Sequence, residues 1–426
     1  MIYREILKKL KSQFHNWEIL GFISMAATLV LMPFPRSWSL YSLGLFIVCG
    51  FWAWVADFKI QWNLMKKQYL LILPFILLFL LHFIFVIAYG DGISKLEDRL
   101  MLILVPIFGL PLFASDLFRK KIKYLYLAFI AGILIIIVYQ IFYEVYLIID
   151  ELGFRNGLRY LTEQPGKCFN RFTLSLFEHT SYISMKVLWA VILVMLLGNE
   201  IHFKRIISAL IVAFLSVIVF LLASRAGIIA WLVVLILLST RMIRNRYVLY
   251  TVFIGLILVT AFFTKNNSKT VSFYNQVGRN INQEKVDWKN FDVRTRIWFS
   301  AAKVIKENPF FGVGPDHVRE RLTQEYSKEK YEIETESEYN AHNQFLEVQL
   351  GYGIAGTFIF LWMFFLLRIH RKRMQYPLLS TMLMVVLFIN FLFESMLNRQ
   401  WGLMFFMIFY CLMLFSVSQK KPLRES

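Results

Sequence analysis

Charged residues are scarce in this chain. Asp, Glu, Lys and Arg make up only 17% of its 426 residues, whereas 58% are hydrophobic. A soluble protein is typically about one-quarter charged and about half apolar. Apolar runs near the length needed to cross a bilayer recur along the whole sequence, and they are too long and too uniform for barrel strands. The composition therefore predicts an all-α, polytopic membrane protein.

Cysteine is also rare, and this excludes two further classes. The three cysteines are Cys49, Cys168 and Cys411, and only Cys168 lies in a connecting segment. No CxxC pair is present, so neither a disulfide framework nor a cysteine metal site is expected. The histidines lack metal-ligand spacing. We therefore predict no metal and no cofactor.

The apolar runs predict about twelve transmembrane helices. Lys and Arg concentrate in alternate short connections, which assigns those connections and both termini to the cytoplasm. The net charge of +18 reflects this topology. Because the basic residues are dispersed over many loops, no nucleic-acid partner is predicted. The predicted spans are 18–34, 38–56, 68–89, 100–115, 122–149, 178–197, 206–223, 225–240, 247–264, 350–368, 377–394 and 400–418.

Four regions follow from these spans. Residues 1–204 hold the first six helices, 205–264 the next three, and 342–426 the last three. Between them, residues 265–341 form a large outward-facing loop between spans 9 and 10. In this loop "VRTRIWFSAAKVIKENPFFGVG" has apolar residues at helical spacing, and a Pro and two Gly then break the predicted helix. "DHVRERLTQEYSKEKYEIETESEY" predicts one further amphipathic helix.

Arg225 is the first candidate for chemistry. Residues 206–240 read either as one very long helix or as two short spans that meet at "ASRAG". We favour two spans, because they keep every basic loop inside, and they place Arg225 at the outer surface. A cation in an apolar setting is costly, which favours an anion-binding role. The alternative is an interfacial arginine that reaches toward lipid headgroups.

Arg294 and Arg296 open the first predicted loop helix, which also carries Trp298. The planar guanidinium donates two parallel hydrogen bonds and suits phosphate. The alternative is a solvated helix end, with Asp287 and Asp292 as the neighbouring counter-charges.

His342 lies in a dense polar cluster, "YNAHNQFLEVQ", directly before an apolar span. A neutral imidazole is a suitable general base near neutral pH. Asn343 and Glu347 are four residues apart and can meet across one helical turn. The alternative interpretation is a cluster that only caps the span and ends the loop.

A G-x-G-x-x-G pattern follows at Gly351, Gly353 and Gly356. The dinucleotide-binding motif requires a preceding strand and a soluble βαβ unit. Here a polar helix precedes the glycines and "TFIFLWMFFLLR" follows them. We therefore expect the glycines to allow a bend and close helix packing.

Three segments, in this order, resemble the O-antigen ligase and polymerase superfamily. They are "SRAG" between two short spans, "RTRIWFSAAKVIKENPFFGVG", and "AHNQFLEVQLGYGIAG" at the start of the next span. The resemblance covers roughly residues 205–370. It implies a metal-independent membrane glycosyltransferase of GT-C-like character at the outer, periplasmic face of the bacterial inner membrane. The implied donor is a glycan on undecaprenyl pyrophosphate.

The resemblance also implies roles for individual residues. The essential arginine between two spans matches Arg225, and the arginine four residues before an aromatic matches Arg294, since Trp298 follows at that distance. The essential histidine before the asparagine matches His342. These three are the predicted catalytic residues. Arg296, Trp298, Asn343 and Glu347 are the predicted substrate-binding residues.

The leading interpretation is an inverting transfer of O-antigen to lipid A–core. The alternative within the same chemistry is a polymerase that extends a growing glycan. A lipid-linked-oligosaccharide transporter is the interpretation from another class, and twelve spans suit it. Against it, the two halves show no matching interrupted helices.

Overall fold

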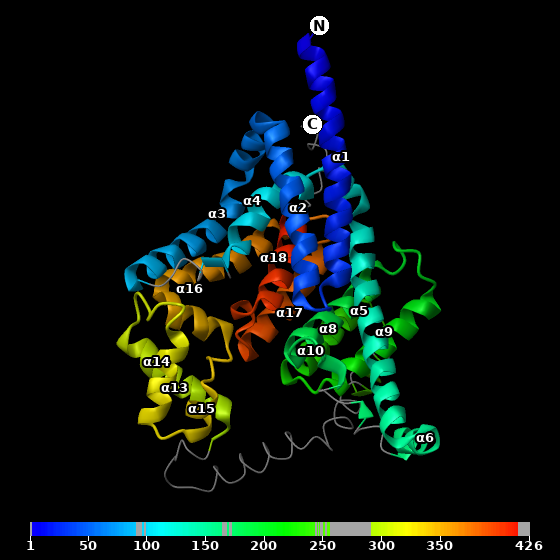
Figure 1. The fold of residues 1–426 in the computed structure, drawn as a ribbon, viewed down its shortest axis with the longest axis vertical. Coiled ribbons are helices and arrows are strands. Elements are labelled where there is room, and N and C mark those ends of the chain that lie inside the picture. The colour runs from blue at the N-terminus through cyan, green and yellow to red at the C-terminus, as the bar shows by residue number, and fades with distance from the viewer. Residues whose placement is uncertain are drawn as a thin grey trace.

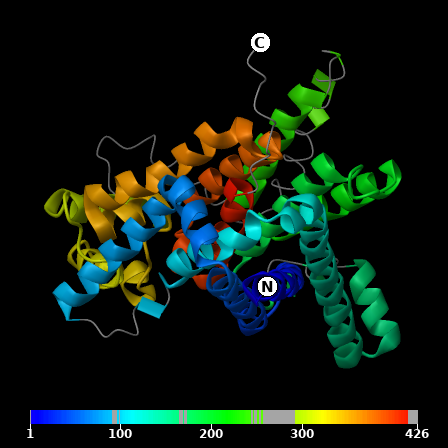
Figure 2. The same ribbon diagram turned by 90° about the horizontal axis from the view of Figure 1, so that it is seen from above.

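The computed structural model describes residues 2–90, 96–163 except 98, 168–169, 173–242 and 291–415, with a few isolated positions between 245 and 255. Within these ranges the regular secondary structure is entirely helical (Figures 1 and 2). Five helices are long and apolar enough to cross a membrane, and five shorter apolar helices accompany them. The chain is a multi-pass membrane protein, as its composition predicts.

The first half of the chain forms a helical bundle whose ends are set by local sequence. The Asp57 side chain accepts a hydrogen bond from Ile60 N and starts one helix, and Ser115 does the same for another through Phe118 N. Both are standard N-caps. The helices are α1 (Ile2–Leu31), α2 (Arg36–Ala56), α3 (Phe58–Tyr89), α4 (Met101–Phe113), α5 (Asp116–Leu152) and α6 (Phe154–Glu163).

Helix α8 (Thr180–Leu197) lies in the interior of the bundle and is almost wholly buried. The next apolar stretch divides into α9 (Arg205–Leu221) and α10 (Arg225–Met242). The turn between them passes through Ala223, which has a positive φ of 50°. The prediction of two short helices that meet at "ASRAG" is confirmed, and Arg225 is the first residue of α10.

The described part of the loop that is predicted to face outward, which we call the outward loop, is a small helical unit beside one end of α16 (Figure 1). It contains α13 (Val293–Glu307), α14 (Val318–Lys328) and α15 (Glu332–Ser337), and it has its own apolar core. The prediction of α13 is confirmed. The prediction of one helix after it is wrong, because the chain breaks at Lys330 (φ 56°) and turns Tyr331 into this core.

The last three helices are α16 (Gln344–His370), α17 (Pro377–Phe393) and α18 (Gln400–Phe415). Figures 1 and 2 both show α16 beside α3, far from it in sequence. Helix α16 is kinked at Gly353 (φ 62°, ψ −157°), and a Cβ there would lie 2.1 Å from the Phe310 carbonyl oxygen. The glycines therefore allow a bend and a close approach, as predicted.

Helices occupy eleven of the twelve predicted spans. The ninth, 247–264, falls almost entirely outside the described residues, as do the loop residues 265–290 and the chain after Phe415. The total of twelve spans, the GT-C-like fold and the four region boundaries remain predictions.

Candidate functional site

Arg225 reaches toward the outward loop. Its Nη1 lies 3.5 Å from Oδ2 of Asp292, the residue that precedes α13. Both side chains are partly exposed, at 38% and 25%. Such a pair in contact with water contributes little to stability. It does bring the start of α10 to the start of α13, where Arg294 lies.

Arg294 is more deeply enclosed than Arg225. Its guanidinium carbon lies 5.9 Å from the centre of the Phe393 ring. Burial lowers the pKa of Arg294, the negative charge of Glu394 opposes that shift, and the positive charge of Arg225 adds to it. Its Nη1 is buried, and no described residue accepts a hydrogen bond from it. An unused donor on a buried cation is costly, so this atom is suited to an anionic ligand.

His342 has an unusual backbone. Its φ is 43°, in the left-handed region that few non-glycine residues adopt. Its N–H donates to Oδ1 of Asn340 at 3.0 Å. The neighbouring carbonyl, Ala341 O, accepts from Nε1 of Trp298 at 3.1 Å. These two bonds fix the direction in which the imidazole leaves the chain.

The imidazole is paired with Glu394, which follows the last residue of α17. His342 Nδ1 and Glu394 Oε1 are 3.0 Å apart. Burial raises the pKa of Glu394, but the hydrogen bond to His342 and the charges of His342, His179 and Arg294 outweigh it, so the pKa lies below its usual value. An ionised carboxylate only accepts, so when the ring is neutral its Nδ1 carries the proton and its Nε2 carries a lone pair.

Glu347 connects the two chain segments that carry this pair. Its Oε2 accepts from Ala341 N at 3.0 Å and from Ser395 Oγ at 3.1 Å. These partners adjoin His342 and Glu394 respectively. Its Oε1 accepts from Asn398 Nδ2 at 2.6 Å. We call this set of contacts the Glu347 bridge, and it holds His342 and Glu394 in register.

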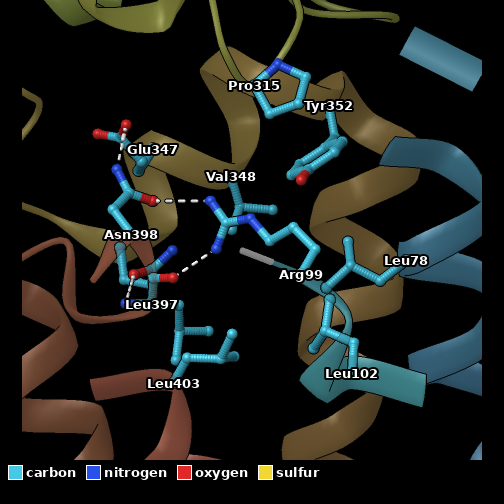
Figure 3. Close-up of a pocket in the computed structure, with 11 residues that line it drawn as sticks. Leu78, Arg99, Leu102, Pro315, Glu347, Val348, Tyr352, Leu397, Asn398 and Leu403 are labelled. Atoms are coloured by element: carbon cyan, nitrogen blue, oxygen red, sulfur yellow. Dashed lines mark hydrogen bonds between the residues drawn. The ribbon is translucent and has the colours of Figure 1, made fainter. Parts of the chain in front are cut away.

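A small, partly open pocket lies beside the Glu347 bridge. Arg99 enters it and hydrogen-bonds to Leu397 O and, at 3.5 Å, to Asn398 Oδ1. Figure 3 shows Asn398 between Arg99 and Glu347, with apolar side chains on the other walls. Arg99 thus supplies a positive charge near a buried carboxylate.

The segment that supplies the two arginines and the histidine is similar to a known family. Residues 209–361 match the Wzy_C family model, described as O-antigen ligase. This segment belongs to the O-antigen ligase superfamily. The match confirms the resemblance, and it includes Arg225, Arg294 and His342. No curated protein matches the chain.

The other residues predicted for this O-antigen ligase segment have internal partners. Arg296 pairs with Glu334 at 2.6 Å, and Glu334 is buried. Trp298 packs against the apolar core of the loop, and its Nε1 donates a hydrogen bond to Ala341 O. The Asn343 side chain accepts from Phe345 N and Leu346 N and caps α16. Their predicted role in substrate binding remains a prediction, and each also has a structural task.

Glu394, Arg99 and Asn398 are site residues that sequence reasoning missed. A signal for Glu394 existed, because no other acidic residue lies between Glu347 and Glu425. A single carboxylate at the end of an apolar span is costly without a partner. Among the described residues, no group of His, Cys, Asp and Glu is arranged to hold a metal ion.

Proposed function

We propose that this protein is an inverting membrane glycosyltransferase that moves a glycan from undecaprenyl pyrophosphate to lipid A–core. The observation that carries the proposal is the buried, unused Nη1 of Arg294 beside the His342–Glu394 pair. A cationic donor and a positioned base are what transfer from a sugar pyrophosphate requires. The match of residues 209–361 to the O-antigen ligase family model supports this class of reaction.

Arg294 and Arg225 bind the pyrophosphate in this proposal. As the bond between the anomeric carbon and the phosphate oxygen breaks, its electron pair remains on the departing pyrophosphate. Guanidinium groups already in place stabilise that charge in the transition state, and burial strengthens the effect. Asp292 keeps Arg225 near the start of α13 until the ligand arrives.

His342 acts as the general base. The acceptor hydroxyl oxygen attacks the anomeric carbon, and its proton passes to Nε2 of His342. Glu394 orients the ring through Nδ1–H and stabilises the imidazolium that forms, as the carboxylate of a catalytic triad does. Attack opposite the leaving group inverts the anomeric centre. Every step uses only groups of this chain, which is why we propose a metal-independent reaction.

The location of the reaction follows from the substrates. The polyprenyl tail of the donor stays in the bilayer, while its pyrophosphate and sugars lie at the surface. The proposed site lies where α10, α16 and α17 meet the outward loop. We propose that this end of the helices faces the periplasm of a bacterial inner membrane and that both termini are cytoplasmic.

The deciding experiment uses purified full-length protein in liposomes with lipid-linked glycan and lipid A–core. Attachment of glycan to the core, together with release of undecaprenyl pyrophosphate, supports the proposal. Longer lipid-linked chains without new core linkage would identify a polymerase instead. Movement of intact donor across the bilayer, with no new glycosidic bond, would identify a transporter.

A further inference from the structure

Helix α16 has one row of exposed apolar side chains. Their spacings of three and four residues keep them on one helical face. In a helix that crosses a membrane, such a face is in contact with lipid tails. We call it the lipid-facing row, and it consists of Ile354, Phe358, Leu361, Phe365 and Ile369.

The lipid-facing row stops where the outward loop meets α16. Ile354 N donates to Pro309 O at 3.1 Å and to Phe310 O at 3.2 Å. One turn earlier, Leu350 O accepts from Val313 N at 2.7 Å, and Leu350 itself is buried. The kink at Gly353 makes room for this contact. The loop therefore covers the turn of α16 that would have extended the row.

Phe310 and Phe311 lie at this junction, and both are exposed, at 65% and 79%. Adjacent exposed phenylalanines are unfavourable in water. Elsewhere in the described part of the loop, Ile333 is the one other large hydrophobic residue that is exposed. The exposed surface of α14 is instead rich in charge, with Arg319 and Lys328.

We propose that Phe310 and Phe311 insert into the outer leaflet and anchor the outward loop to the membrane. Phe310 O accepts a hydrogen bond from the N–H of Ile354, the first residue of the lipid-facing row, so the exposed Phe310–Phe311 pair adjoins that apolar surface. The occupant of this surface is therefore the acyl region of the bilayer. Lipid insertion also removes their apolar surface from water.

The anchor has a geometric consequence for the site. Helix α13 runs from Val293 to Glu307, and the Phe310–Phe311 pair follows its C-terminal end after a short turn. A helix of this length spans roughly 22 Å. The membrane would thus hold one end of the helix whose other end carries Arg294.

Spin labels on the full-length chain in lipid nanodiscs test the proposal. The native cysteines are buried, so Phe310→Cys and Phe311→Cys supply the reactive thiols, with unlabelled wild type as the background. Phe358→Cys marks the lipid-facing row and Lys328→Cys marks water. We expect oxygen to relax the spin labels at 310, 311 and 358 more than a nickel chelate does. At 328 we expect the nickel chelate to relax the label more than oxygen does.

Labels at 310 and 311 that behave like the label at 328 would overturn the proposal. Protection from both reagents would also overturn it, because it would indicate a protein partner. A second measurement uses the unmodified chain. Phospholipids with a diazirine on the acyl chain are expected to crosslink the peptide that contains Phe310 and Phe311. Adducts on α16 with none on this peptide would contradict lipid insertion.

Discussion

Two charged clusters in this protein are built in opposite ways. In α8, the Lys186 ammonium lies 2.7 Å from Glu178 and 2.9 Å from Met32 O, and its side chain is fully buried. At the candidate site, Arg225 and His342 are partly exposed, and Arg294 Nη1 has no acceptor among the described residues. A sealed pair belongs to the folded structure, whereas an open cluster with an unused donor is suited to a ligand.

The largest expected effect comes from removing the base. Positioned general bases contribute about 10²- to 10⁴-fold, so we expect His342→Ala to lower the transfer rate by about 10³-fold. Donor binding should persist, because the arginines remain. Release of undecaprenyl pyrophosphate in liposomes measures the rate. His317→Ala is the matched control: that ring lies 4.6 Å from Tyr89, and most of the activity should remain. Undiminished transfer by His342→Ala would exclude its role as base.

Arg294→Ala tests the arginine of the open cluster that is proposed to bind the leaving pyrophosphate. Loss of one preorganised donor to developing charge typically costs about 10²- to 10³-fold, and we expect a loss of this size in kcat. Arg225→Ala should act in the same direction. Arg319→Ala, in the same loop, removes an exposed arginine that pairs with Glu338 and should leave transfer intact. Equal transfer rates for Arg294→Ala and Arg319→Ala would contradict the claim that the unused donor of Arg294 binds a ligand whereas the paired Arg319 does not.

Glu394→Gln should lower kcat on the order of 10²-fold with little change in KM, because the amide still accepts from Nδ1 but no longer stabilises imidazolium. The pKa of Glu394 lies below its ordinary value of 4.5. Its charge should therefore persist as pH falls to this value and be lost only below it. An infrared titration in which the carboxylate band that is missing in Glu394→Gln already disappears between pH 7 and 5 would contradict this assignment.

Lys186→Met tests the sealed cluster and should act on stability. It leaves Glu178 as an unpaired buried carboxylate, and breaking a buried pair in this way costs about 3–5 kcal/mol. We expect a lower melting temperature in detergent, with the transfer rate of the remaining folded protein unchanged. Adding Glu178→Leu should recover much of the lost melting temperature. A variant that is fully stable but catalytically inactive would show that this cluster belongs to the site.

The smallest effect is expected from a chelator. Because the proposed transition state is stabilised by guanidinium groups, EDTA should leave the transfer rate nearly unchanged. The rate is measured in liposomes before and after metal removal. Loss of activity that a divalent ion restores would contradict the metal-independent mechanism.

Local sequence predicted most of the elements, because apolar runs and charge alternation directly reflect the bilayer. It also located the break before Arg225 and the bend at Gly353. The division between α14 and α15 was not predictable in the same way. It depends on Tyr331 turning into the loop core, which is a tertiary contact.

The candidate site shows the same limit. His342 and Arg294 could be selected by residue type and setting, but the partner of His342 lies 52 positions further along the chain. Glu347 and Asn343 were predicted to meet across a helical turn. Instead, Asn343 caps the helix while Glu347 bridges to Ser395 and Asn398. Which neighbours a polar side chain finds is decided by the packing of distant helices.

The positive φ of His342 has a consequence for how the protein fails when warmed. A residue in this conformation typically carries about 1–3 kcal/mol of strain, which the surrounding contacts must sustain. Here those contacts are hydrogen bonds from His342 N to Asn340 Oδ1, from Trp298 Nε1 to Ala341 O and from Ala341 N to Glu347 Oε2. When they loosen, the backbone relaxes and swings the ring away from Glu394, while the helices remain assembled. Heat inactivation is therefore expected to precede melting of the bundle.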